Sequence, residues 1–343
     1  MKFEGLIIFR TTLPWVAVLL FMASCQQPDQ VTVLKLAHGL DQSHPVHQGM
    51  AFMAERVYEK SGGTLRLEIY PSGQLGTERE NVELLQIGSL AITKVSAAIM
   101  EGFAPSYRIF GLPYIFTGRE HAHRVLDSDI GREILLDSER FWLRGLTFYD
   151  AGSRSFYTKD RPINHPNDLR GLKIRVMQSP SAVNMVRAFG GSPTPISWGE
   201  LYTALQSGVV DGAENNPPSF FLSHHYEVCR YYSLNEHTTI PDVLLISTKI
   251  WKTLSPQKQQ WLQEAANESA IHQRILWEES EKESLRLAEE AGVTIIYPDK
   301  APFIERAQSL HEAHKQDEKF YSLIKRIKAL QQTAVEAEIA TTQ

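Results

Sequence analysis

The chain has 343 residues, a formal net charge of -5 at pH 7 and two cysteines, Cys25 and Cys229. This length predicts two domains, each large enough to bury its own core. Basic and acidic residues are interspersed along the chain, which argues against a nucleic-acid partner, and two thiols are too few for a cysteine-based metal or redox motif.

Residues 1–24 have the pattern of a signal peptide. Two basic residues precede an apolar run at 13–23, which is too short to span a bilayer comfortably. The run ends in FMASC, which resembles a lipoprotein processing box and predicts acylation of Cys25 at the start of a polar tether, 25–30. Because Met22 stands where such boxes usually have leucine, ordinary cleavage without a lipid anchor is the alternative.

Strands and helices alternate over the next part of the chain, which predicts a parallel α/β sheet. The segments VTVLKLAHGL, TLRLEIYP and LAITKVSAA have the composition of strands. A helix is expected to begin at Pro45. A second helix is expected after Thr77, which is a good N-cap residue with Glu80 at the capping-box position.

Three polar residues at the ends of these strands are candidates for ligand binding: His44, Glu78 and Lys94. His44 can equally be a helix-start residue, and Glu78 can equally be a first-turn partner of a helix dipole. Lys94 lies inside an otherwise apolar strand, where it must either reach solvent or meet an anion, because burying an unpaired ammonium costs several kcal/mol.

A helix is predicted from about Arg119 to Leu143, and the strand LTFYDAGSRSFYT then carries the chain into a second domain. Gly152 is a plausible flexible point of that strand, and Arg154 lies just past it. The strands RYYSLNEHTTI and DVLLIST return the chain, so the first domain is discontinuous in sequence. The predicted divisions are a first domain at 31–150 and about 240–320, a second at 151–239, and a C-terminal helix and tail at 321–343.

The second domain contains a site that would attract an anion. Arg175 lies near the C-terminal end of the strand LKIRV, and Ser179 followed by Pro180 signals the start of the next helix. A guanidinium and a helix N-terminus thus face each other beyond the end of a strand, where open α/β sheets bind ligands. Pairing of Arg175 with an internal Asp or Glu is the alternative. Asn215 lies at another strand-to-helix corner.

A long helix is predicted to follow Ser255 and Pro256, because neither glycine nor proline intervenes until Gly292. Roughly 36 residues at 1.5 Å each span about 54 Å, which is well beyond one small domain. The helix must therefore bridge or flank both domains.

Three motifs of this chain occur together in one known family. They are GLKIRV, the pattern E-x-Y-x-A-L-Q-x-G at Glu200 to Gly208, and VDGAENNP at Val210 to Pro217. In combination they resemble the extracytoplasmic substrate-binding subunit of TRAP transporters, the tripartite ATP-independent periplasmic carriers for organic acids. The similarity extends from about Val33 to beyond Gly292.

This resemblance implies an α/β fold of two lobes joined by a hinge, with the long helix bridging them. It makes Arg175 the carboxylate-binding arginine, Asn215 a ligand-contacting amide and Arg154 a second ligand-side arginine. It implies a periplasmic location, a small organic acid and the TRAP membrane carrier as partners, and neither cofactor nor metal. Contact with the membrane itself would be made only through the anchor at Cys25.

The favoured ligand is a sugar acid, specifically glucuronate or galacturonate. An ionised Glu78 accepts hydrogen bonds from hydroxyls but repels a second carboxylate. A C4-dicarboxylate or a small keto acid, and a sensory subunit with the same cleft, are the alternatives. An enzyme is a further hypothesis, which would predict turnover. The sequence has no dinucleotide loop, phosphate loop, HExxH motif or nucleophile elbow.

Overall fold

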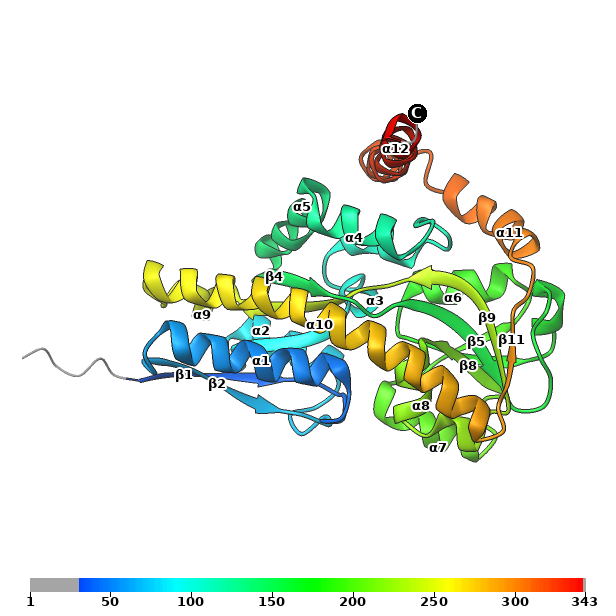
Figure 1. Cartoon of the computed structure of the whole chain (residues 1–343), viewed down its shortest axis with the longest axis horizontal. Coiled ribbons are helices and arrows are strands. Elements are labelled where there is room, and N and C mark those ends of the chain that lie inside the picture. The colour runs from blue at the N-terminus through cyan, green and yellow to red at the C-terminus, as the bar shows by residue number, and fades with distance from the viewer. Residues whose placement is uncertain (1–30, 342–343) are drawn as a thin grey trace, which may run out of the picture.

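The computed structural model describes residues 31–341, so the predicted signal peptide, tether and acylation site at Cys25 lie outside the described residues. Two mixed β-sheets lie side by side, each with helices on both faces, and form lobe I and lobe II (Figure 1). The predicted two-lobed α/β fold is confirmed. In the described part of the chain, no helix is both long and apolar enough to cross a membrane.

The sheet of lobe I has the strand order β2-β1-β3-β10-β4. Its first three members pair in parallel, as expected, but β10 runs antiparallel to both of its neighbours, because the chain enters it from lobe II. The strands are β1 (Thr32–Ala37), β2 (Leu65–Tyr70), β3 (Ile92–Ser96), β4 (Leu143–Tyr149) and β10 (Asp242–Ser247).

Helices cover both faces of this sheet and bury two apolar clusters. One face packs against α1 (Pro45–Lys60) and the first part of α10 (Pro256–Glu290). The elements of the other face and its edge are α2 (Glu78–Ile87), α3 (Ala97–Met100), η1 (Pro105–Gly111), α4 (Arg119–Asp127), α5 (Asp129–Asp137), η2 (Ser138–Phe141) and α12 (Glu318–Thr341). The short helix α9 (Thr248–Trp251) follows β10, and its Ile250 and Trp251 pack against the cluster under α1 and α10.

Local capping decides where several of these helices begin. Thr77 and Glu80 form the predicted capping box of α2. The prediction of a single helix from Arg119 to Leu143 is wrong, because the structure has two helices, α4 and α5, that meet at Ser128. The extended backbone of Ser128 ends α4, and its side chain accepts a hydrogen bond from the Ile130 N–H at the start of α5.

The sheet of lobe II has the order β11-β9-β5-β8-β6-β7. Its strands are β5 (Ser153–Thr158), β6 (Lys173–Val176), β7 (Ser192–Pro195), β8 (Gly212–Asn215), β9 (Tyr231–Thr239) and β11 (Thr294–Ile296). Its helices are η3 (Pro166–Leu169), α6 (Pro180–Ala188), η4 (Trp198–Glu200), α7 (Leu201–Gln206), α8 (Pro217–Leu222), η5 (His225–Glu227) and α11 (Ala301–Glu312).

The last part of the chain is distributed between the two lobes differently from the prediction. We expected residues from about 240 to 320 in lobe I, but β11 pairs in parallel with β9 and α11 packs on α6, both in lobe II. The reason is that α10 ends beside lobe II, so the next strand joins the nearer sheet (Figure 1). The chain then returns to lobe I, where α12 packs against α4.

The lobes are joined by strand crossings and by α10. The strand predicted across residues 146–158 is two strands, β4 and β5, one in each sheet. Between them, Gly152 has φ +55°, and a Cβ there would lie 2.9 Å from Trp277 Nε1. The helix α10 has 35 residues, or about 52 Å. It packs on α1 and on α8, which confirms the bridging helix.

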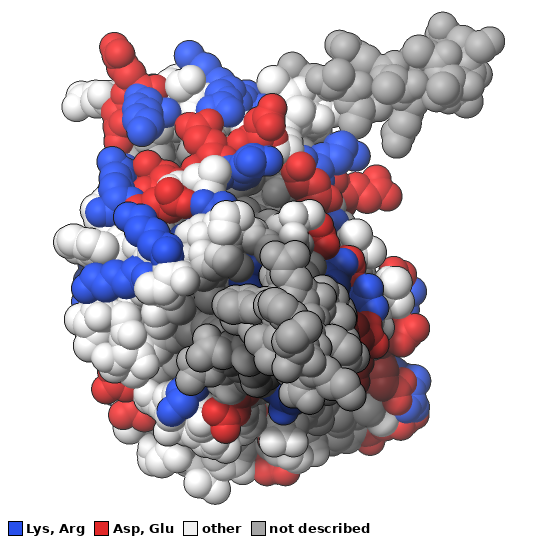
Figure 2. Space-filling view, turned by 90° about the vertical axis from the view of Figure 1, so that its left-hand side faces the viewer, with Lys and Arg blue, Asp and Glu red and all other residues white. Residues whose placement is uncertain are grey.

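Figure 2 shows the end of the molecule that lies at the left of Figure 1, where lobe I is remote from lobe II. Basic and acidic side chains are mixed on its upper part, beside a broad uncharged area. On the part of this face that the described residues form, the charges are therefore interspersed, as they are along the sequence.

Candidate ligand-binding cleft

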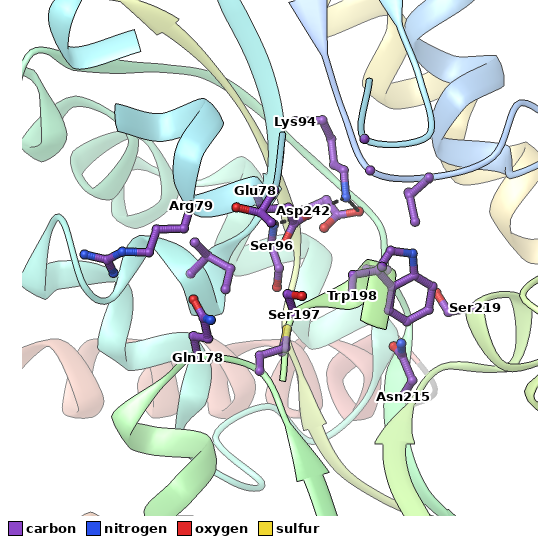
Figure 3. Close-up of a pocket in the computed structure, with 18 of the residues that line it drawn as sticks. Glu78, Arg79, Lys94, Ser96, Gln178, Ser197, Trp198, Asn215, Ser219 and Asp242 are labelled. Carbon is purple, nitrogen blue, oxygen red and sulfur yellow. Dashed lines mark hydrogen bonds and ion pairs between the residues drawn. The ribbon is translucent and has the colours of Figure 1, made fainter. Parts of the chain in front are cut away.

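A cavity of about 650 Å³ lies between the lobes. All six residues singled out in the sequence line it: His44, Glu78, Lys94, Arg154, Arg175 and Asn215. Lys94, Glu78, Ser96 and Asp242 come from lobe I, and they face Gln178, Ser197, Trp198 and Asn215 of lobe II (Figure 3). The structure therefore brings the two sets of predicted residues together across one cleft.

Arg175 is a buried cation with an unused donor. Its side chain leaves the end of β6 and is 2% exposed. Its Nε donates to the Ile196 carbonyl at 2.9 Å, and the guanidinium lies 6.0 Å from the centre of the Trp198 ring. Its Nη1 is buried and has no hydrogen-bond partner among the described residues. Among the described residues, no internal carboxylate pairs with Arg175, so the alternative of an internal ion pair is not found.

Burial lowers the pKa of Arg175, because the charged form has lost its water. A guanidinium nevertheless stays charged in proteins, and a buried donor without a partner costs free energy. An anionic ligand atom would supply the missing partner.

Arg154 has an arrangement that differs from that of Arg175. Its Nε donates to Glu214 at 2.5 Å, its Nη2 donates to the carboxylate and carbonyl of Glu214 at 2.9 and 2.8 Å, and its Nη1 donates to Asn215 Oδ1 at 2.6 Å. These four bonds leave little of the guanidinium for a ligand. They also orient the Asn215 amide, because its oxygen accepts from Arg154 and its NH₂ group therefore points to the opposite side of the Cβ–Cγ bond.

Glu214 is the counter-ion that makes this arrangement stable. Burial alone would raise the pKa of Glu214, but the charge of Arg154 and the imidazole of His237 outweigh it and lower the pKa to about 2. Glu214 is therefore ionised at neutral pH, and the buried pair with Arg154 is electrically neutral.

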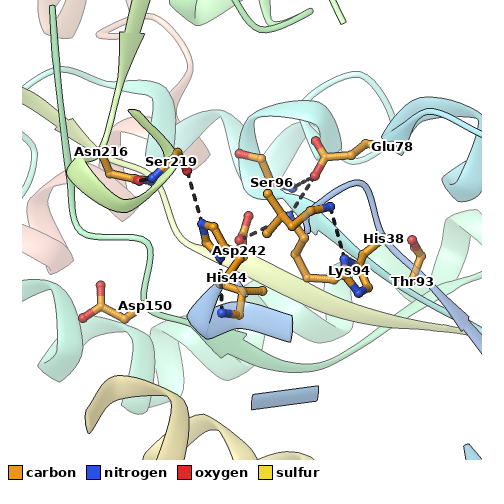
Figure 4. Close-up of polar contacts among 12 residues, drawn as sticks. His38, His44, Glu78, Thr93, Lys94, Ser96, Asp150, Asn216, Ser219 and Asp242 are labelled. Atoms are coloured by element: carbon orange, nitrogen blue, oxygen red, sulfur yellow. Dashed lines mark hydrogen bonds and ion pairs between the residues drawn. The ribbon is translucent and has the colours of Figure 1, made fainter. Parts of the chain in front are cut away.

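Lys94 meets two carboxylates in the wall of lobe I (Figure 4). Its Nζ lies 3.0 Å from Glu78 Oε1 and 3.3 Å from Asp242 Oδ2. Burial alone would lower the pKa of Lys94, but Asp242 and Glu78 outweigh it and raise the pKa. Burial and the charge of Glu78 raise the pKa of Asp242, against the opposing effect of Lys94. With all three groups ionised, this wall carries one net negative charge.

His44 caps α1 and also reaches toward lobe II. Its Nδ1 accepts a hydrogen bond from the Val46 N–H at 3.3 Å, so the neutral ring carries its proton on Nε2. That atom lies 3.4 Å from Ser219 Oγ of α8 (Figure 4). Burial and the nearby Lys94 lower the pKa of His44 to about 3, which keeps the ring neutral. His44 therefore has both of the roles considered for it, since it begins α1 and also lines the cleft.

The N-terminus of α6 holds a different anion from the one expected. Ser179 caps the helix as predicted, since its hydroxyl accepts a hydrogen bond from the Ala182 N–H. We expected a ligand to use this helix end together with Arg175. Instead, the carboxylate of Glu101 from lobe I binds there, because it accepts hydrogen bonds from Ser179 and Ser181.

The sequence analysis missed two residues that shape the cleft. Asp242 is the first residue of an otherwise apolar strand, and a lone carboxylate in that position is a signal that could have indicated a partner for Lys94. Trp198 lies between β7 and α7, packs against the apolar clusters of both lobes and lines the cavity. An aromatic face of this kind suits the apolar face of a sugar ring.

The arrangement suits one class of molecule. Lobe II offers a cation, an amide and an aromatic face, and lobe I offers charged groups and an imidazole that can exchange hydrogen bonds with hydroxyls. A solute with one carboxylate at one end and several hydroxyls at the other end would match both walls. Among the side chains that the structure describes, those of residues 31–331, no group of three or more His, Cys, Asp or Glu suited to a metal ion is found.

The chain is similar to known proteins over most of its length. The profile of the bacterial extracellular solute-binding proteins of family 7 (DctP) matches residues 36–317. The uncharacterised protein YiiZ of Salmonella typhimurium is 40% identical over 298 residues, which are 86% of this chain and 91% of that protein.

Two solved structures share the fold. A TRAP periplasmic solute-binding protein from Xanthobacter autotrophicus, with bound β-D-galacturonate, is 38% identical with a TM-score of 0.84, over 86% of this chain and 99% of that chain. A second such protein, from Anaerococcus prevotii with bound α/β-D-glucuronate, is 38% identical with a TM-score of 0.86, over 88% and 99%.

Proposed function

The chain belongs to the bacterial extracellular solute-binding proteins of family 7, and on that premise we propose that it binds a hexuronate, glucuronate or galacturonate, for delivery to a TRAP membrane carrier. The protein acts by binding and release rather than by catalysis. The observation that carries the choice of ligand is the unpartnered Nη1 of Arg175, which lies across the cleft from a wall suited to hydroxyls.

At the carboxylate end, Arg175 makes the main ion pair. Buried donors in folded proteins nearly always have partners, so its free Nη1 is a place for a ligand oxygen. Arg154 acts as the second cationic donor through the guanidinium N–H that its bonds to Glu214 and Asn215 leave free. The NH₂ group of Asn215 fixes the orientation of the carboxylate. Charge-assisted hydrogen bonds of about 1.5 to 3 kcal/mol each offset the desolvation of one carboxylate.

At the hydroxyl end, Glu78 and Asp242 accept hydrogen bonds and the His44 Nε2–H donates one. Lys94 holds the two carboxylates in place and lowers their mutual repulsion. A second carboxylate on the ligand would meet the net negative charge of this group, so a C4-dicarboxylate fits it less well. The uronates bound to the two similar structures support this assignment.

We also propose that the mature protein lies in the periplasm, anchored by a lipid at Cys25. The family is extracellular, and FMASC supports acylation. In the native host, Cys25→Ser should move the protein from the membrane fraction to the soluble fraction, and mass spectrometry of the wild-type N-terminus should find a diacylglyceryl group. An unmodified N-terminus in the wild type would refute the anchor.

The ligand is tested by thermal unfolding of the mature chain with glucuronate, galacturonate, gluconate, succinate and pyruvate. A solute at about 100 times its Kd adds roughly 2.7 kcal/mol to folded stability, which raises Tm by a degree or more. Uronates should raise Tm, and calorimetry then ranks the two epimers. A shift with succinate alone would overturn the uronate and leave solute binding intact.

A further inference from the structure

Glu101 belongs to lobe I, but its carboxylate binds the end of a lobe II helix. It is the C-cap residue of α3. Its Oε2 accepts from Ser179 Oγ at 2.6 Å and from the Ser181 N–H at 3.2 Å, and its Oε1 accepts from Ser181 Oγ at 2.7 Å. Three hydrogen bonds therefore cross from one lobe to the other at the N-terminus of α6.

The surfaces around these bonds are in close contact. Met177 belongs to lobe II, but it is buried in the apolar cluster of lobe I with Ile99. A Cβ at Gly111 would lie 2.5 Å from the Cβ of Ser181, so α6 rests directly on the backbone of η1. These contacts require the two lobes to be together, because they join side chains on opposite sides of the hinge.

The same segment carries the ligand-binding arginine. Arg175 ends β6, Met177 and Gln178 follow, and Ser179 begins the cap of α6. Gln178 lines the cavity, whereas Glu101 is not among the residues that line it. A movement of lobe II that seats Arg175 on a solute therefore also seats Ser179 and Ser181 on Glu101.

We propose that Glu101 is a positioning residue for solute capture, and that it sets how long the solute stays bound by holding the lobes closed. The inference rests on the proposed function, in which Arg175 takes the carboxylate of the solute. Glu101 provides the negative charge that the α6 N-terminus favours, and its bonds to Ser179 and Ser181 are charge-assisted. In the open protein, water replaces these bonds, so the contact stabilises the closed form specifically.

The test uses Glu101→Gln, Ser181→Ala and, as the charge-matched control, Glu55→Gln, which changes an exposed carboxylate on α1. Association and dissociation rates for D-glucuronate and D-galacturonate are measured by stopped-flow tryptophan fluorescence. For the first two variants, the dissociation rate should rise about tenfold, with little change in the association rate or in the Tm of the ligand-free chain. Equal dissociation rates in Glu101→Gln and Glu55→Gln would overturn the proposal, as would a loss confined to ligand-free Tm.

Gly111→Ala tests the same closed contact without touching a charge. Its new Cβ would collide with Ser181 only when the lobes are together, so dissociation should again become faster. Wild-type kinetics in this variant would show that the solute is held without the contact of α6 on η1, which contradicts the proposal.

Failure of the proposed function can be distinguished from failure of this inference. If the wild type binds neither uronate, the proposed function fails, and Glu101 is then tested by hydrogen exchange in the complex with whichever of gluconate, succinate and pyruvate raises the Tm. In that complex, peptides spanning residues 178–183 should exchange about fivefold faster in Glu101→Gln than in Glu55→Gln, because the Ser181 N–H has lost its charged acceptor. Equal exchange in the complex would overturn the role of Glu101 whatever the solute.

Discussion

Asp242 Oδ2 lies 3.3 Å from Lys94 Nζ, and this contact joins the strand that returns from lobe II to the strand beside it in lobe I. Lys94 is thus neutralised by the protein itself, with Glu78 as its other partner. It orders two carboxylates at the cleft and is not a free cation for a ligand carboxylate. The cleft is therefore divided between a lobe I wall with net negative charge and the cation Arg175 in lobe II.

Arg175→Ala should weaken hexuronate binding by about 3 to 5 kcal/mol, because it leaves the solute carboxylate buried without its partner. Isothermal titration calorimetry measures the effect. Arg187→Ala, which removes an exposed arginine from α6, is the control and should bind as the wild type does. A loss below about tenfold would place the anion site elsewhere.

Glu78→Gln should weaken uronate binding about tenfold, because a neutral amide accepts hydrogen bonds less strongly than a carboxylate. The same change leaves Lys94 with less negative charge beside it, so succinate should bind as well as before or better. Calorimetry with both solutes tests the contrast, with Glu55→Gln as the control. If both solutes respond alike, Glu78 has a structural role.

Glu214→Gln should destabilise the ligand-free protein by about 3 kcal/mol at pH 7, because it leaves Arg154 buried without a counter-ion. The pKa of Glu214 is lowered from 4.5 to about 2, so the ionised side chain contributes its stability above pH 4.5 and loses it as the pH falls toward 2. Guanidinium unfolding at pH 7, 5 and 3 should show the two proteins converging in stability. A difference that stays constant with pH would contradict this assignment.

Gly152→Ala should destabilise the protein by about 1 to 3 kcal/mol, because the residue has φ +55° and a Cβ would press on Trp277 and Glu281. Gly292→Ala is the matched control, since Gly292 also has positive φ but open space around it. The difference in Tm between the two variants measures the packing at the crossing point. Equal losses would mean that backbone strain alone is responsible.

Much of the fold was predictable because its signals are local. Thr77 with Glu80, Ser179 before Pro180, and Ser255 before Pro256 each mark a helix start that the structure contains. The cleft residues were found for a related reason. Strand ends and helix starts can be recognised as short sequence patterns, and in this fold several of them lie around the same cleft.

What the sequence did not indicate depends on contacts between distant segments. Glu101 has nothing beside it in sequence that reveals Ser179 and Ser181 as its partners. Asp242 meets Lys94 only because β10 lies next to β3. The three-residue strand β11 was assigned to the wrong lobe because nothing in so short a strand specifies which sheet it joins.

The last part of the chain contributes to both lobes, and this affects the order in which they fold. The outer strand of lobe II, β11, and the helix α12 that completes the lobe I core both come from the last part of the sequence. Neither lobe can therefore finish folding while that part is still being synthesised. Both lobes therefore stay incompletely folded until β11 and α12 are available to pack on them.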